Sequence, residues 1–450
     1  MRMGAVLLGW LGGVPLGAGW IAQARAQAPL VKRPLPDYDG RGLPQPDPAN
    51  AALLVPRLLL SPLFLADEYL LRRPLSVALP AAERHDVPRR LYDFFTFGPG
   101  HRGGFLPAGF AEFDLQPSYG VYVFWRDAFL TGHDLFLHAE TWTADWLSVA
   151  LSQHLRFGRH LVKLQIRAIH RPDYPFYGVG PEAARAHRSR YGARTLESKG
   201  SYEVRLWRAS YLSAGVGVRA VAFSPGWHDA DPSVEDAVAA GRFAAPPGLD
   251  RGYAAELQHL TAVVDTRQPW PEAGSGVRLK ARVEEANALD ASSGARWLHT
   301  EAAATGFWDV TGQRRVLSLT VAAQFTDPLG AGAVPFTELV MLGGNGLMRG
   351  FPWQRLLDRS AAVATLRYEW PVGPWITGAL QGALGNVFDA HLRSFDRRLL
   401  RLSWAVGLSS EKASSSEYPI ELLFGFGTRT LDDGAGIESV RLAVGVNYGI

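Results

Sequence analysis

The sequence predicts an all-β protein: a 16-stranded antiparallel transmembrane β-barrel, preceded by a signal peptide and a short, proline-rich, partly helical periplasmic segment. Long runs of alternating polarity predict the strands, because successive side chains of a strand point to opposite faces. These runs are even in number, as in single-chain bacterial barrels. The chain also begins with a hydrophobic segment, and no later segment is hydrophobic enough to span a membrane as a helix.

The first 26 residues have the pattern of a secretory signal peptide. Arg2 supplies the positive start, an apolar stretch runs from Gly4 to Ile21, and small residues then place the cleavage site after Ala26. The alternative is a transmembrane anchor. No later run reaches the ~18 apolar residues that a spanning helix needs, so we do not expect a helical membrane protein.

Residues 27–101 are rich in proline and poor in alternating runs. Leucines suggest helical pieces that Pro56, Pro62 and Pro74 break, because proline disrupts a helix interior. Arginine pairs at 72–73 and 89–90 add positive charge. Three placements are open for this segment: on the periplasmic membrane surface, against the barrel mouth, or in the barrel lumen.

Residues 102–450 form the predicted outer-membrane barrel. In residues 277–284, valine, leucine and alanine alternate with arginine, lysine and glutamate. Many runs last 10 or more residues, whereas ordinary strands average ~5–6 and tilted membrane strands need ~9–11. The predicted strands are 104–113, 118–127, 133–142, 145–156, 159–170, 198–209, 211–224, 253–267, 275–286, 294–309, 313–326, 360–370, 375–386, 399–410, 418–428 and 438–448.

The connections between predicted strands alternate in length near the C-terminus. Pro371 to Pro374 is a tight turn, whereas 387–398 and 429–437 are longer. Outer-membrane barrels have short periplasmic turns and longer external loops. We therefore expect Ile450 in the periplasm, and the long connection 170–199 outside.

Composition excludes several kinds of site. Without cysteine there is no disulfide, thiolate metal site or cysteine nucleophile, and a net charge of +3 gives no case for nucleic-acid binding. The 12 histidines lack metal-ligand spacing, and Ser224-Pro225-Gly226 lacks the frame of a nucleophile elbow. We expect no catalytic residues, metal or cofactor, hence no enzyme. The 14 tryptophans suit the aromatic girdles of a barrel or the core of a soluble protein.

A glycine-rich stretch from Leu342 to Trp353 surrounds one arginine. A strand-like run follows it, whereas a phosphate-binding glycine loop leads into a helix. We therefore predict a loop that folds back onto the barrel. Its key residues are Gly343, Gly344, Arg349, Gly350 and Phe351.

This loop resembles the arginine-glycine-aromatic loop of the BamA/TamA family of outer-membrane β-barrel proteins (the bacterial surface antigen family). Other stretches resemble further family motifs in the same order along the chain. Asp265, Arg267, Pro271 and Gly274 match its Asp-x-Arg turn, with Gln268 in place of a second aspartate. The charged strand end 367–371 and the Gly-Asn-Val segment 385–389 follow the loop.

The resemblance implies that the loop arginine folds into the lumen and meets acidic side chains. Alternation puts Glu369 on the lumen face with Thr365 and Arg367, so Glu369 is the predicted partner of Arg349. Ala383 occupies the position of a usual aspartate partner, so that family contact is missing. The alternative for Arg349 is a solvated loop arginine.

The resemblance also implies a function and a location. The family works in the outer membrane of Gram-negative bacteria, where its members insert or translocate proteins through a seam between the first and last strands. The implied partners are outer-membrane lipids and unfolded outer-membrane protein clients. Residues 27–101 do not suit a POTRA module, so the chain resembles a short form of the family. The alternatives are a passive channel or structural barrel for small solutes or lipids, and a secreted soluble β-protein.

Overall fold

The computed structural model describes residues 67–445, apart from 268–273, 291–293, 311, 313 and 373–375, and 411–419; Ser61 and Leu65 are also described. The predicted signal peptide and most of the proline-rich segment lie outside these residues. No helix in the described part is both long and apolar enough to cross a bilayer.

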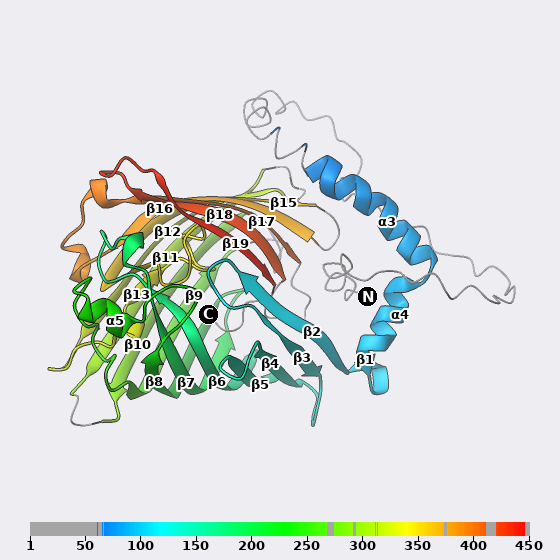
Figure 1. Cartoon of the computed structure of the whole chain (residues 1–450). Helices are drawn as coiled ribbons and strands as arrows, with labels where there is room; N and C mark the ends of the chain where they lie inside the picture. The colour runs from blue at the N-terminus through cyan, green and yellow to red at the C-terminus, as the bar shows by residue number, and fades with distance from the viewer. Residues whose placement is uncertain are drawn as a thin grey trace, which may run out of the picture. The chain divides into compact units, whose positions relative to one another are not determined.

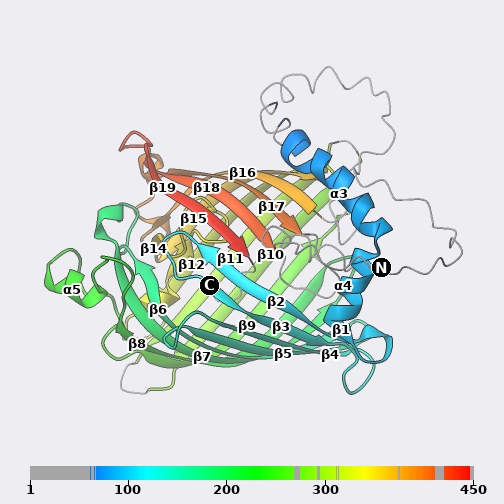
Figure 2. The same ribbon diagram turned by 45° about the vertical axis from the view of Figure 1, so that its right-hand side comes forward.

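Sixteen antiparallel strands close into a barrel, as the sequence predicted (Figures 1 and 2). Each strand pairs with its neighbour in chain order, and the last strand pairs with the first. The barrel strands are β2 Gly103–Glu112, β3 Ser118–Trp125, β4 His133–Thr141, β5 Leu147–Phe157, β6 His160–Phe176, β7 Ser189–Arg205, β8 Tyr211–Pro225, β9 Tyr253–Asp265, β10 Gly276–Ala288, β11 Arg296–Asp309, β12 Val316–Pro328, β15 Ser360–Pro371, β16 Ile376–Phe388, β17 Arg401–Ser410, β18 Glu421–Thr430 and β19 Ile437–Gly445.

Three short strands accompany the barrel strands. β1 (Thr96–Phe97) pairs with β2, and the hairpin of β13 (Val340–Leu342) and β14 (Leu356–Asp358) lies between β12 and β15. One α-helix, α5 (Val234–Ala239), lies in the connection from β8 to β9. The short 3-10 helices are Pro99–His101, Arg185–His187, Phe336–Glu338, Ala390–Leu392 and Arg397–Leu399.

The helical segment before Phe95 belongs to a different compact unit from most of the barrel. It contains a π-helix (Asp67–Arg72) and the α-helices α3 (Arg73–Arg84) and α4 (Val87–Phe95). Pro74 lies where the π-helix gives way to α3, as the second residue of α3, and the first turn of a helix accepts proline. Pro80 lies inside the same helix.

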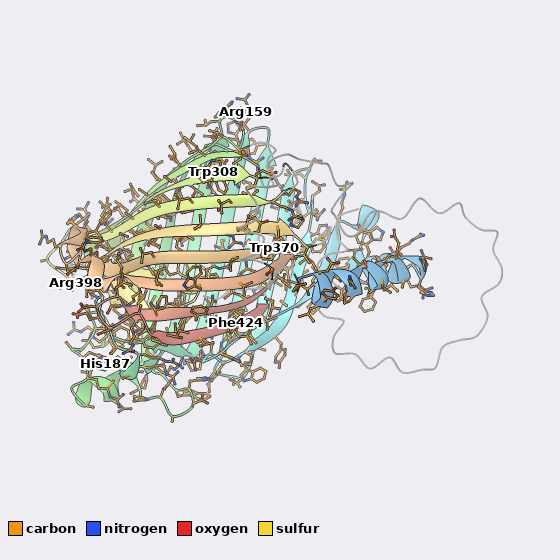
Figure 3. All side chains as sticks on the ribbon, turned by 90° about the horizontal axis from the view of Figure 1, so that it is seen from above. Arg159, His187, Trp308, Trp370, Arg398 and Phe424 are labelled. Atoms are coloured by element: carbon orange, nitrogen blue, oxygen red, sulfur yellow. The ribbon has the colours of Figure 1, made fainter. Side chains whose placement is uncertain are left out.

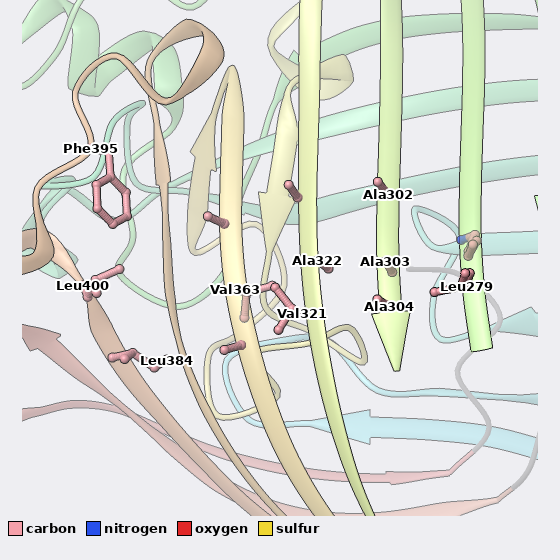
Figure 4. Close-up of a pocket in the computed structure, with 14 residues that line it drawn as sticks. Leu279, Ala302, Ala303, Ala304, Val321, Ala322, Val363, Leu384, Phe395 and Leu400 are labelled. Carbon is pink, nitrogen blue, oxygen red and sulfur yellow. The ribbon is translucent and has the colours of Figure 1, made fainter. Parts of the chain in front are cut away.

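The two faces of the wall differ as alternation predicts. On β10, Leu279 and Val283 are exposed on the outer face, whereas Lys280 points inward and its Nζ lies 2.8 Å from a carboxylate oxygen of Glu301 on β11. Ion pairs of this kind satisfy charges that face the lumen. The outer face also has an apolar recess of about 680 Å³, lined in part by Leu279, Ala302, Ala304, Val321, Leu384 and Phe395 (Figure 4).

The two ends of the barrel differ in their connections. At one end, here the turn end, residues 158–159 and 206–210 are short turns. At the other, the loop end, residues 226–252 and 329–359 form long connections. His187 and Arg398 mark the loop end and Trp370 lies toward the turn end (Figure 3).

The predicted long loop from His170 to Lys199 is much shorter than expected. β6 continues to Phe176 and β7 already begins at Ser189. A register shift between Arg171 and Tyr174 interrupts the alternation, and the extended hairpin is buried instead of having one exposed face. For both reasons the pattern did not reveal these strand residues.

A hydrophobic cluster fills the lumen side of the loop end. It brings side chains of the extended β6–β7 hairpin together with Val234 of α5, Phe336 and Leu357. Phe336 is fully buried, and its ring centroid lies 5.0 Å from that of Tyr191. The long connections therefore fold inward and pack as a core, which gives the arginine loop a firm support.

Candidate functional site

The arginine loop is the tip of the β13–β14 hairpin, residues 343–355. Gly343 and Gly344 have positive φ angles of 116° and 61°, a region that favours glycine. A Cβ atom at Gly343 would lie only 2.3 Å from the backbone oxygen of Pro352. The backbone N–H of Gly344 donates to the oxygen of Phe351 at 2.9 Å. These two glycines therefore allow the loop to turn back on itself.

Gly350 brings the loop into direct contact with the barrel wall. A Cβ atom there would lie 2.1 Å from the backbone oxygen of Phe426 on β18. The Gly350 N–H donates to Oγ of Ser403 on β17 at 2.8 Å, and the Gly350 oxygen accepts from Ser439 on β19 at 3.1 Å. The ring of Phe351 covers Gly427, where a Cβ would meet it at 2.4 Å. No larger side chain fits at Gly350 without moving the loop.

Arg349 is buried, with 8% of its surface exposed, and forms an ion pair with Glu421 of β18. Burial lowers the pKa of its guanidinium below the ordinary value, and the Glu421 carboxylate opposes that shift. A charge in this position needs a partner, because desolvation without one is costly. The solvated-arginine alternative does not describe this side chain.

The predicted pairing of Arg349 with Glu369 is not found. Glu369 does lie on the lumen face of β15, but it accepts from Nε of Arg367 at 2.8 Å. Arg367 is two residues away on the same face and neutralises it locally. Ala383, at the position of the usual family aspartate, packs instead in a hydrophobic cluster with Met348 and Phe351 under the loop.

Substitutions of Glu421 and Glu369 should lower the stability of the barrel by different amounts. Glu421→Gln leaves the buried Arg349 without a counter-charge, and we expect it to lower the free energy of unfolding by about 1–3 kcal/mol. The control Glu369→Gln affects a more exposed pair and should cost less than about 1 kcal/mol. Urea titration of the refolded barrel in detergent micelles measures both. A larger loss for Glu369→Gln would contradict the assignment of Glu421.

A second carboxylate attaches the same connection to the opposite wall. Glu338, just before β13, accepts from Nη1 of Arg219 on β8 at 2.6 and 2.9 Å. The hydroxyl of Tyr253 on β9 also donates to Glu338. No sequence pattern indicates Glu338, because it lies in a loop without periodic alternation. Its partner Arg219 did stand out in the sequence, because it is a charged residue in the otherwise apolar run 211–224.

The Gly-Asn-Val segment has a structural role at the loop end. The Asn386 side-chain amide donates to the backbone oxygens of Pro181 at 3.1 Å and Leu399 at 2.6 Å. Pro181 lies in the connection between β6 and β7. Nearby, Glu438 lies 2.7 Å from both Arg355 and Arg401. These contacts join separate loop-end segments to each other.

The Asp-x-Arg motif forms a separate ion pair at the turn end. Nη2 of Arg267 lies 2.6 Å from Oδ2 of Asp265, and Asp265 is buried. Gly274 is buried on the far side of the turn, while Pro271 lies outside the described residues. The pairing fits the prediction of a turn pair. In the described part of the chain, no group of three or more metal-ligating side chains could hold a metal ion.

Comparisons with known proteins bear on this architecture. Residues 257–436, which include the Asp-x-Arg turn, the arginine loop and the Gly-Asn-Val segment, match the Omp85 superfamily domain. Over these residues the barrel is similar to the barrels of the Omp85 superfamily. This match confirms the BamA/TamA-like fold that the sequence motifs predicted. No curated protein matches the chain by sequence.

Solved structures share the fold of this barrel at low sequence identity. BamA from Haemophilus ducreyi lacking POTRA domains 1–3 is 15% identical, with a TM-score of 0.53, over 77% of this chain and 70% of that one. CdiB from Escherichia coli is 13% identical, with a TM-score of 0.50, over 78% of this chain and 63% of that one. The chain thus spans less than two thirds of the CdiB chain.

Proposed function

We propose that this Omp85-type barrel inserts or translocates proteins, without enzymatic catalysis, through the seam between β19 and β2. Two observations support this function: residues 257–436 are similar to the Omp85 superfamily domain, and the barrel closes between its last and first strands. Among the described residues, the paired positions are Ala443 with Glu112, Val444 with Ala111, and Gly445 with Phe110.

Two strands, β1 and β19, pair with different parts of the β2 edge that faces the seam. β3 occupies the other edge of β2 along its length, so β1 pairs on the seam side, with Thr96 opposite Gly104 and Phe97 opposite Gly103. Separation of β19 from β2 would leave the backbone groups on this edge of β2 unpaired. Unpaired backbone groups on a strand edge can accept a further strand by β-augmentation.

The proposal includes a location and partners. Export through the cleaved signal peptide brings the chain to the outer membrane of a Gram-negative bacterium. The apolar outer face contacts outer-membrane lipids, and unfolded outer-membrane proteins are the clients. The turn end faces the periplasm and the loop end faces outward, as in other barrels of this kind.

A liposome assay tests the proposed activity. The purified barrel is reconstituted in liposomes, and an unfolded client barrel is added. Folding of the client is followed by its heat-modifiable migration on a gel. We expect clearly faster insertion than into empty liposomes or liposomes that hold a barrel of another family. Equal rates would contradict the proposed activity and favour the alternative, a passive channel or structural barrel, which planar-bilayer conductance then measures.

A further inference from the structure

One buried ion pair joins the first and last strands of the barrel. Nε of Arg441 on β19 donates to Oε1 of Glu112 on β2 at 2.7 Å, and Nη2 donates to Oε2 at 2.9 Å. Both side chains are almost fully buried, with 1% and 0% of their surface exposed. This two-point geometry is the strongest that arginine and a carboxylate can form. It lies beside the three paired positions of the seam.

The same guanidinium also holds the arginine loop. Nη1 of Arg441 donates to the backbone oxygen of Gly344 at 2.7 Å, and Nη2 donates to Oδ1 of Asn345 at 2.8 Å. A longer bond of 3.3 Å reaches the backbone oxygen of Arg349. One side chain therefore contacts β2 and the tip of the loop while it belongs to β19.

We propose that Arg441 and Glu112 form a lock that couples the seated arginine loop to the closed seam. The loop oxygens complete the hydrogen bonding of Arg441 and hold its fork toward Glu112. If the loop leaves its seat, Arg441 loses these acceptors and the seam loses rigidity. The coupling is reciprocal, because two linked equilibria affect each other by the same factor.

This inference deepens the proposed function, on which it rests for its biological purpose, but its physical content is independent of any client. The ion pair between Arg441 and Glu112 is buried and has two-point geometry, so it contributes to the cohesion of the seam. Removal of one partner leaves a charge buried without compensation. The arginine loop therefore controls how readily the two edge strands separate.

An engineered cysteine pair reports the state of the seam. The chain has no cysteine of its own, so Ala111→Cys with Val444→Cys introduces a single possible disulfide. These residues are register partners on the outer face of β2 and β19. Neighbouring positions of an antiparallel pair have Cβ atoms roughly 4.5–5.5 Å apart, close enough to cross-link while the seam is closed. The rate of disulfide formation under mild oxidation is measured in micelles without client.

The lock predicts a specific set of rates. In this background, Arg441→Lys keeps a positive charge but loses the fork, and Glu112→Gln keeps the shape but loses the charge. We expect each to slow cross-linking about ten-fold. Lys280→Gln is the matched control, since it breaks an inter-strand ion pair between β10 and β11. It should leave the rate unchanged. Heat-modifiable migration selects folded protein in every sample.

A further variant, Gly350→Ala, tests the coupling between the loop and the seam. Gly350→Ala displaces the loop and should slow cross-linking when Arg441 is present, yet add little to Arg441→Lys. Unchanged cross-linking in both Arg441→Lys and Glu112→Gln would overturn the lock, and additive effects of Gly350→Ala and Arg441→Lys would overturn the coupling. The liposome assay tests the proposed function independently of the lock. If client insertion fails but the cross-linking rates follow the lock, only the proposed function is refuted. If clients insert but the cross-linking rates do not change, only the lock is refuted.

Discussion

A disulfide across the seam is expected to abolish client insertion. With Ala111→Cys and Val444→Cys oxidised, β2 and β19 cannot separate, so a client strand cannot pair with the edge of β2. Insertion into liposomes should fall to the rate of empty liposomes. A reductant should restore the activity, because the cross-link is the only change. The measurement is client folding with and without reductant on one sample.

The control cross-links two strands that have no reason to separate. Ala302 on β11 and Ala323 on β12 are also register partners, away from the seam. Their cysteine variant should form a disulfide and insert clients at the unmodified rate. If the oxidised seam variant remains active, clients do not pass through this seam. If both cross-linked barrels lose activity equally, the seam has no special part.

Substitution of Gly350 is expected to release the arginine loop. In Gly350→Val, the new side chain would occupy the space of the Phe426 backbone oxygen, which lies 2.1 Å from an added Cβ. The loop must move, which withdraws Arg349 from Glu421. Trypsin then reaches the bond after Arg349, and we expect cleavage there about 10–100-fold faster than in the unmodified barrel. Mass spectrometry of the fragments identifies the cut.

A second loop glycine provides the comparison. At Gly346 an added Cβ would meet only the Gly343 oxygen, at 3.3 Å, so a shift of a few tenths of an ångström accommodates alanine. Gly346→Ala should leave Arg349 protected. Protection of Arg349 in Gly350→Val would show that the loop does not need its contact with β18. Equal cleavage in both variants would point to general flexibility of the loop.

Sequence pattern was sufficient for most of the fold. Fourteen of the sixteen barrel strands were predicted within about three residues of their observed bounds, because a wall between lipid and a charged lumen demands strict alternation. β6 and β7 were the exception at one end. There the strands leave the two-sided wall and join a buried core at Tyr174 and Tyr191, so the period of two no longer applies.

The site was predictable only in part. Local glycines revealed that the loop turns sharply, and alternation correctly put Glu369 on the lumen face. Alternation cannot rank carboxylates on different strands, so Glu421 was not chosen as the partner of Arg349. The pair of Arg441 and Glu112 could not be predicted from the sequence, because its members are 329 residues apart and meet only where the barrel closes.

The two attachments of the arginine-loop connection have a mechanical consequence. Glu338 is bound to β8, the seventh strand from the seam, and Arg349 to β18, the fifteenth, so the anchors lie on opposite sides of a sixteen-strand ring. The connection between them is an internal strut that fixes the diameter of the barrel along that axis. The cross-section therefore resists flattening by lateral pressure from the bilayer. Widening at the seam would therefore involve mainly the strands on its side of the strut, β19 and β2 to β7.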